Sequence, residues 1–151
     1  MFDLTDRVAI VTGGAQGVGG GISRRLARAG AKVLIADLDL ETAEDTANQI
    51  SKDSGIVECV ETDVTSYEDL KKMIGKARDY WGKLDILVNN AYAAADGQQG
   101  GALEVTEERW EEDIRALVTS VYAGSKYAIP LMLETGSGSI VNISSVHGFL
   151  V

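Results

Sequence analysis

A cluster of glycines near the N-terminus has the spacing of a phosphate-binding turn. The segment from Thr12 to Gly19 reads Thr-Gly-Gly-Ala-Gln-Gly-Val-Gly and follows the apolar, β-branched run Val8–Val11. After a buried strand, Gly13 permits a sharp turn, Gly17 lets the backbone approach a pyrophosphate, and Gly19 lets the next helix pack closely. Free N–H groups and the dipole at the start of that helix favour an anion. The predicted contacts from this loop are Gly13, Gln16, Gly17, Val18 and Gly19. Glycines also serve ordinary strand–helix turns, so the loop alone leaves a purely structural role open.

An acid at the end of the second apolar run suits the recognition of a ribose. Asp37 lies 18 residues after Gly19, close to the distance at which such an acid meets an adenosine ribose. Its carboxylate would accept hydrogen bonds from both ribose hydroxyls and would repel a 2′-phosphate. Neither Gln16 nor Leu38, the neighbours that could oppose this preference, carries a positive charge. The pattern predicts NAD rather than NADP, although an acid at this place can also cap a helix or a turn.

Polar residues also end the later apolar runs, and open parallel sheets bind ligands at the carboxyl ends of their strands. Ser145 ends one such run, and its hydroxyl can both donate to and accept from a substrate oxygen. A serine at a strand end can equally be a turn residue. The single cysteine, Cys59, has the setting of a small core residue, and His147 that of a loop residue. One cysteine and one histidine leave no metal cluster of usual ligand spacing, so no metal site is predicted.

Strand-like and helix-like segments alternate along the chain, which is typical of a parallel α/β sheet with helices on both faces. The strands are expected at 8–11, 32–37, 56–61, 84–90 and 139–145. Apolar residues at helical spacing are expected to form helices within 22–29, 39–50, 65–81 and 106–132. Gly30 is expected to cap the first helix, Thr65 and Glu68 to form a capping box, and Thr106 to cap the last helix, which Pro130 should kink or shorten. The segment 91–105 has little periodicity and is predicted to be a mobile loop.

Composition and charge restrict the classes of function. The chain of 151 residues carries 14 basic and 23 acidic residues, a net charge of −9, which opposes binding to nucleic acid. No apolar run approaches the roughly 20 residues that a membrane helix needs, and the N-terminus is acidic where a signal peptide would be basic. These features predict a cytoplasmic protein, with residues 1–151 forming a single domain and no membrane partner.

Four motifs in order resemble the classical short-chain dehydrogenases/reductases over essentially the whole chain. Thr12-Gly13-x-x-x-Gly17-x-Gly19 is similar to the family's cofactor loop. Asp63-Val64 is similar to its adenine-contact pair. Asn89-Asn90-Ala91 matches three residues of its Asn-Asn-Ala-Gly motif, and Ile140–Ser145 resembles the strand that ends in its catalytic serine.

The resemblance implies a fold, a cofactor and a reaction. The fold would be a Rossmann-like doubly wound parallel sheet, with its five strands in the order 3-2-1-4-5. The activity would be hydride transfer between NAD(H) and an alcohol or carbonyl substrate. Leu38, Asp63, Val64, Asn90 and Ala91 would join the cofactor contacts, and Ser145 would orient the substrate oxygen.

The chain also departs from the family pattern. In the family a tyrosine acts as general acid/base, a neighbouring lysine lowers its pKa, and an asparagine in the long helix holds a relay water. Leu117 stands at the asparagine position, and Tyr92 replaces the last glycine of the Asn-Asn-Ala-Gly motif.

The tyrosine and lysine themselves would follow Ser145 beyond Val151. We therefore expect a chain truncated before them and inactive alone. The pairs Tyr67–Lys71 and Tyr122–Lys126 have the Tyr-x-x-x-Lys spacing but precede Ser145, so they are read as coincidental.

Three interpretations remain open. The first is an NAD-dependent oxidoreductase whose cofactor-binding part this chain carries. The second is a catalytically inactive NAD-binding or oligomerisation module. A serine hydrolase built on Ser145 and His147 is the weakest, because no Gly-x-Ser-x-Gly elbow surrounds the serine. In the family the long helix pairs with its copy in a second subunit, so a homo-oligomer through the helix 114–132 is expected.

Overall fold

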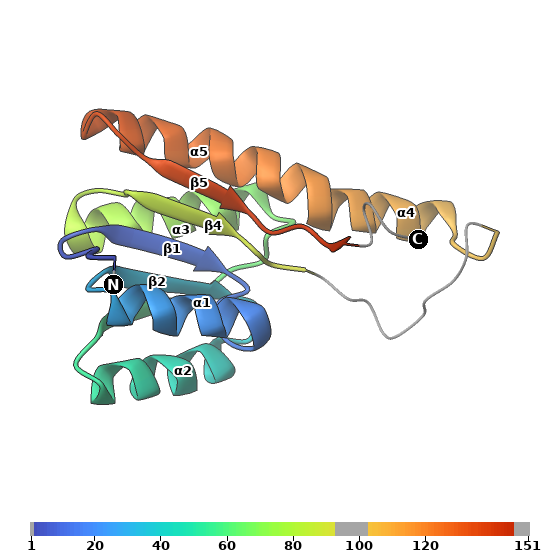
Figure 1. Ribbon diagram of the computed structural model, residues 1–151. Helices are drawn as coiled ribbons and strands as arrows, with labels where there is room; N and C mark the ends of the chain where they lie inside the picture. The colour runs from blue at the N-terminus through green and yellow to red at the C-terminus, as the bar shows by residue number, and fades with distance from the viewer. Residues whose placement is uncertain (1, 93–102, 147–151) are drawn as a thin grey trace.

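Five parallel strands form one sheet in the computed structural model, which describes residues 2–92 and 103–146. The strands are β1 (Val8–Thr12), β2 (Lys32–Asp37), β3 (Ile56–Glu61), β4 (Ile86–Asn89) and β5 (Ser139–Asn142). Their order across the sheet is β3-β2-β1-β4-β5 (Figure 1). The predicted parallel sheet and its strand order are therefore confirmed.

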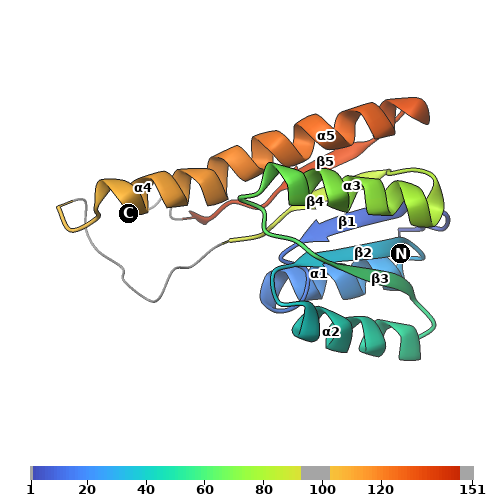
Figure 2. The same ribbon diagram turned by 180° about the vertical axis from the view of Figure 1, so that it is seen from behind.

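Helices cover both faces of the sheet, as expected for a doubly wound fold. The helices are α1 (Gly17–Arg28), α2 (Leu40–Lys52), α3 (Tyr67–Trp81), α4 (Glu107–Ile114) and α5 (Ser120–Glu134). A π-helical segment, η1 (Arg115–Thr119), joins α4 to α5. Helices α1 and α2 lie on one face and α3 and α5 on the other, while α4 projects beyond the carboxyl ends of the strands (Figures 1 and 2).

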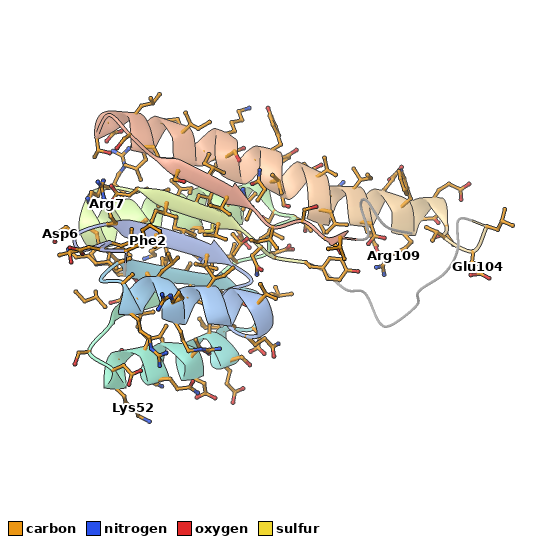
Figure 3. All side chains as sticks on the ribbon, in the orientation of Figure 1. Phe2, Asp6, Arg7, Lys52, Glu104 and Arg109 are labelled. Carbon is orange, nitrogen blue, oxygen red and sulfur yellow. The ribbon has the colours of Figure 1, made fainter. Side chains whose placement is uncertain are left out.

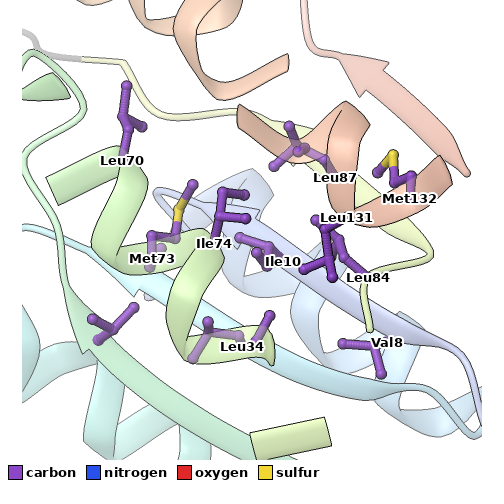
Figure 4. Packing of buried hydrophobic residues seen from close by; sticks show 14 of the residues in the cluster. Val8, Ile10, Leu34, Leu70, Met73, Ile74, Leu84, Leu87, Leu131 and Met132 are labelled. Carbon is purple, nitrogen blue, oxygen red and sulfur yellow. The ribbon is translucent and has the colours of Figure 1, made fainter. Parts of the chain in front are cut away.

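Two apolar clusters hold these layers together. The larger lies between the sheet and α3 and α5, where Ile10 and Leu34 pack with Met73 and Leu131 (Figure 4). The second lies on the side of α1 and α2 and includes Val33. Every apolar side chain of β1 is 0% exposed, because both faces of this central strand are covered.

One part of the sheet carries less cover. Within residues 2–92 and 103–146, an apolar groove of about 680 Å³ opens beside α1, over β4 and β5. Val141 and Ile143 line it, and these side chains are 42% and 43% exposed. The burial of β5 therefore differs sharply from that of β1, although both strands have apolar sequences.

Several predicted boundaries shift. The strand expected over 84–90 is β4, Ile86–Asn89, and the one expected over 139–145 ends at Asn142. The helix expected over 106–132 is interrupted by the π-helical segment and runs to Glu134. Pro130 lies inside α5, four residues before its end, so it does not terminate the helix.

The predicted capping box at the start of α3 is wrong by one residue. Ser66, not Thr65, is the N-cap, and its Oγ accepts a hydrogen bond from the Asp69 backbone N–H at 3.2 Å. The hydroxyl of Thr65 instead donates to Asp63 Oδ1 at 2.7 Å. Thr106 caps α4 as expected. No helix among the described residues is long and apolar enough to cross a membrane.

Candidate functional site

The glycine loop lies at the point where the strand order reverses. From β1 the chain proceeds to β2 and β3 on one side and returns through β4 and β5 on the other. Thr12 is in register with Ala36 of β2, and Val11 with Val88 of β4. The residues that follow these three strands therefore converge at one edge of the sheet, where doubly wound folds bind nucleotides.

The three glycines that define the loop are each required by its geometry. Gly13 and Gly17 have φ of +61° and +56°, a region that side-chain-bearing residues rarely adopt. A Cβ on Gly13 would lie 2.8 Å from Ala91 Cα, and one on Gly19 would overlap the carbonyl oxygen of Gly13. Gly19 therefore permits the close packing of α1 that the sequence predicted for it.

The start of α1 has backbone groups suited to an anion. The N-cap residue, Gln16, makes no side-chain capping hydrogen bond, and the first turn contains no acidic residue. The first amides of a helix have no intrahelical partners, and the helix dipole adds partial positive charge there. The exposed side chain of Val18 (68%) adds apolar surface at the same end. This end of α1 can accept a phosphate group.

Asn90 and Ala91 are held against the loop. Thr12 Oγ1 accepts hydrogen bonds from the backbone N–H groups of Asn90 at 3.0 Å and Ala91 at 3.1 Å. Asn90 Nδ2 donates to the carbonyl oxygens of Thr12 and Gly13 at 3.0 and 3.1 Å. The side-chain amide of Asn90 thus fixes the loop, which is a positioning role beside the cofactor contact that the sequence predicted.

Asp37 lies beside the loop and already has backbone partners. Its Oδ2 accepts from the Ala15 N–H at 2.9 Å, and its Oδ1 accepts from the Asp39 N–H at 3.2 Å. Each carboxylate oxygen has further lone pairs, so both can still accept from ribose hydroxyls. Leu38, next in the chain, is 69% exposed.

Asp63 and Val64 lie farther along the same edge, in the turn from β3 to α3. Asp63 Oδ1 accepts hydrogen bonds from the backbone N–H and the hydroxyl of Thr65, at 2.8 and 2.7 Å, and Val64 packs against the larger apolar cluster. Asp63 also lines a cleft of about 540 Å³ that faces α4 and Arg109.

Arg109 is engaged within its own helix. A side-chain hydrogen bond with Asp113 raises the pKa of Arg109 above its usual value. Figure 3 shows Arg109 at the opposite end of the molecule from Arg7, which lies near the amino ends of the strands.

The proposed catalytic residue lies on the same edge but in a more open part of it. Ser145 is exposed and follows β5 by three residues. Asn142, at the end of β5, is tied to the preceding strand because its Oδ1 accepts from Asn89 Nδ2 at 2.8 Å. Leu117 lies in the π-helical segment and is 44% exposed. His147 lies outside the described residues, so its predicted loop setting and a Ser145–His147 pair remain predictions.

The pair Tyr122–Lys126 forms a contact on the surface of α5. Lys126 Nζ lies 5.6 Å from the centroid of the Tyr122 ring, and the hydrogen bond to Tyr122 raises the pKa of Lys126. Both side chains are exposed, and Tyr122 is 59% accessible.

Of the predicted mobile loop 91–105, residues 93–102 lie outside the described part. Tyr92 is described and is 66% exposed.

Two hydroxyl groups that sequence reasoning missed also hold the glycine loop. Ser23 Oγ donates to the carbonyl oxygens of Gly14 and Gly19, at 3.0 and 3.1 Å. Thr46 Oγ1 donates to the Ala15 carbonyl oxygen at 2.6 Å. The sequence could have indicated these roles, because each residue is a hydroxyl residue on the inner face of an amphipathic helix, where a buried polar group needs a hydrogen-bond partner.

Among the described residues, no three His, Cys, Asp or Glu side chains are grouped so that they could hold a metal ion.

Comparison with known proteins gives consistent results. The family model for short chain dehydrogenases matches residues 7–151. An uncharacterized oxidoreductase of Staphylococcus aureus (strain USA300) is 38% identical over 154 residues, which cover 100% of this chain and 63% of that protein. An uncharacterized oxidoreductase of Thermotoga maritima is 36% identical over 146 residues, which cover 97% of this chain and 56% of the relative.

A solved structure shares the fold. A crystal structure from Burkholderia xenovorans, provisionally assigned as a short-chain dehydrogenase/reductase, aligns with a TM-score of 0.90 and 31% identity. The alignment covers 98% of this chain and 60% of that one. The chain thus spans about three fifths of the length of the proteins that it matches.

Proposed function

The chain belongs to the short-chain dehydrogenase family of oxidoreductases, and from that premise we propose that it binds NAD for hydride transfer to or from an alcohol or carbonyl substrate. The observation that carries this proposal is the 2.9 Å hydrogen bond from the Ala15 N–H to Asp37 Oδ2. This bond places an acid suited to ribose hydroxyls directly against a glycine turn suited to a pyrophosphate. We infer that the two groups serve the adenosine ribose and the pyrophosphate of one bound dinucleotide.

The residues at this edge fit the cofactor. The loop amides and the start of α1 would hold the pyrophosphate, and Asp37 would accept hydrogen bonds from the ribose hydroxyls. Asp63 and Val64 would contact the adenine, as in the family. When bound, NAD would supply the nicotinamide ring that accepts a hydride. Asp37 would repel a 2′-phosphate, which supports NAD over NADP.

Ser145 is the proposed contact for the substrate oxygen. Its hydroxyl can donate a hydrogen bond to a carbonyl oxygen or accept one from an alcohol, which orients the reacting carbon. The Tyr122–Lys126 pair lies on the outer surface of α5, so we assign it no proton transfer.

The cofactor proposal is tested by calorimetric titration of the chain with NAD and NADP. Asp37→Asn keeps an oxygen that can accept from Ala15 but removes the negative charge. We expect the ratio of NADP to NAD affinity to rise by about tenfold or more, since removing one unfavourable charge contact is worth about 1.4 kcal/mol. Adding Leu38→Arg should raise NADP affinity further. Asp45→Asn, an exposed acid on α2, is the matched control and should change neither affinity.

Two outcomes would contradict the proposal. Equal affinity of the parent chain for NAD and NADP would remove the assigned role of Asp37, and binding of neither would remove the cofactor site.

We further propose that the helix 114–132 mediates a homo-oligomer. Its exposed apolar side chains are Ile114, Leu117, Val118, Tyr122 and Ile129, which are 37–59% accessible. Exposed apolar residues that share one face of a helix are typical of an interface between protein subunits. Light scattering should show an oligomer that Val118→Glu converts to a monomer, whereas Asn48→Glu on α2 should not. A monomeric parent chain would contradict this proposal.

A further inference from the structure

The central residue of the glycine loop is held through both of its peptide groups. The Ala15 N–H donates to Asp37 Oδ2 at 2.9 Å, and the Ala15 carbonyl oxygen accepts from Thr46 Oγ1 at 2.6 Å. Ala15 is 1% and Thr46 5% exposed, so water does not compete effectively for these bonds. The two residues that hold Ala15 come from different elements, the end of β2 and the middle of α2.

These bonds form part of a closed ring. Asp37 Oδ1 accepts from the Asp39 N–H at 3.2 Å, and Asp39 is the N-cap of the helix that carries Thr46. The Asp39 side chain accepts from the backbone N–H and the hydroxyl of Thr42, at 3.0 and 2.6 Å, which fixes the first turn of α2. The ring therefore runs from Asp37 through Ala15 and Thr46 into α2 and back to Asp37.

The position of the ring gives it a consequence for binding. Ala15 directly precedes Gln16, the N-cap of α1, and Gly17, its first residue, where the pyrophosphate is proposed to bind. The orientation of the Ala15 peptide groups therefore restricts the direction of the next amides along the chain. Because Asp37 holds the other side of the same residue, displacement of the loop also disturbs the carboxylate that would bind the ribose.

We propose that Thr46 is a positioning residue for the dinucleotide, which holds Ala15 so that pyrophosphate binding by the loop and ribose binding by Asp37 occur together. The inference rests on the proposed NAD site. Thr46 would affect dinucleotide binding entirely through Ala15, without touching a cofactor atom. A valine would fill the same space but would leave the buried Ala15 carbonyl oxygen without this donor.

The test uses the whole chain and titration with NAD below the unfolding temperature, where circular dichroism shows each variant to be folded. Thr46→Val should weaken NAD binding about tenfold, because Ala15 and the amides after it would no longer be held in the orientation for binding. Thr46→Ser restores the hydroxyl and should recover most of that loss. Ser120→Ala removes a buried hydroxyl that bonds to Ala116 at 2.5 Å, away from the loop, and is the matched control.

A double-mutant cycle separates positioning from general destabilisation. Thr46→Val and Asp37→Ala should weaken NAD binding by less together than the product of their separate effects, because each variant removes one of the two hydrogen bonds that hold Ala15. Independent, multiplicative effects would overturn the coupling, and so would parental NAD affinity in Thr46→Val.

A second measurement distinguishes failure of this inference from failure of the proposed function. Hydrogen exchange of the cofactor-free chain should show faster exchange of the Ala15–Gly17 amides in Thr46→Val than in the parent. Unchanged exchange would overturn the role of Thr46 even if the parent binds NAD. A parent that binds no dinucleotide would overturn the proposed function and the coupling, whatever the exchange result.

Discussion

The strands β1 and β5 both contain an isoleucine followed by a valine, but the two strands differ widely in burial. Every apolar side chain of β1 is 0% exposed, whereas Val141 of β5 is 42% exposed and borders the apolar groove. The loop after β1 is fixed by hydrogen bonds with Asp37 of β2, Asn90 after β4 and Thr46 of α2, while Ser145 follows β5 on an exposed segment. The difference lies in the cover that neighbouring elements provide, because both faces of β1 are covered whereas the apolar groove leaves β5 open on one face. The glycine loop is held by hydrogen bonds within the protein itself.

The largest effect is expected from the closest packing in the β1 region. Gly19→Ala would place a methyl group on the backbone of the loop, because the Cβ would overlap the Gly13 carbonyl oxygen. Relieving such an overlap moves the loop, and we expect NAD affinity to fall about 100-fold or more. The measurement is calorimetric titration with NAD.

The same helix provides the control. A Cβ on Gly21 meets no atom within 4 Å, so Gly21→Ala should leave binding unchanged and stabilise α1 by about 0.5–1 kcal/mol. Equal losses of affinity in the two variants would show that the loop has no special requirement at Gly19.

Removing the side chain that holds the start of β1 should have the next largest effect. Asp85 is 5% exposed and accepts hydrogen bonds from Arg7 at 2.8 Å and the Val8 N–H at 2.9 Å, with Lys83 Nζ at 3.0 Å. It therefore ties the start of β1 to the segment before β4. Asp85→Ala should lower the free energy of unfolding by about 3 kcal/mol, because it leaves the buried Val8 N–H unpaired as well as removing the ion pairs. Urea denaturation measures the loss.

The same carboxylate makes stability depend on pH. Burial alone would raise the pKa of Asp85, but the hydrogen bonds from Arg7, Val8 and Lys83 outweigh it and hold the pKa below its usual value. A group with a lowered pKa in the folded state contributes stability above its unfolded pKa, about 3.9. This contribution is lost as the pH falls from about 4 through the folded pKa. Asp85→Asn should lack this part of the acid-induced loss, and an unchanged profile would contradict the assignment.

Two valines on the same face of the sheet test the comparison directly. Val33 of β2 is 0% exposed under α1 and α2, whereas Val141 of β5 lines the groove. Val33→Ala should cost about 2–3 kcal/mol of unfolding free energy, the sum of lost burial and the cavity that remains. Val141→Ala should cost less than about 1 kcal/mol. Equal costs in denaturant titrations would show that Val141 is covered in solution.

The sequence was most informative about the region with the strictest geometry. Gly13 and Gly17 have positive φ, and a Cβ on Gly13 or Gly19 would meet backbone atoms, so the spacing of these glycines predicts the turn at residue level. The alternation of apolar runs predicts the parallel sheet, and the family resemblance supplies the strand order. Backbone positions that disfavour a side chain leave the clearest signals.

The sequence did not predict structural features for which two similar residues compete, such as the choice of the N-cap residue of α3. Thr65 and Ser66 are both good caps, each followed three residues later by an acid. Ser66 becomes the N-cap because the Thr65 hydroxyl is bound to Asp63. The role of Thr46 in holding Ala15 needed knowledge of how α2 packs on the loop. The strand β5 ends at Asn142 because Asn142 is in register with Asn89, the last residue of its only described partner strand, and no local pattern of apolar residues encodes that register.

The smallest predicted effect distinguishes the N-caps of a well-packed helix, α3, and an exposed helix, α4. Ser66 caps α3, which buries Leu70 and Met73 in the larger apolar cluster, whereas Thr106 caps α4, which has no buried residue. Ser66→Ala should lower the global free energy of unfolding by about 1 kcal/mol, because α3 unfolds only with the core. Thr106→Ala should leave global stability unchanged within about 0.3 kcal/mol, because α4 can open locally without exposing the core. Its signature would be faster hydrogen exchange confined to 107–112. If Thr106→Ala lowered the global free energy of unfolding as much as Ser66→Ala, α4 would be packed in solution. The contrast between α3 and α4 would then be smaller than their exposed surfaces indicate.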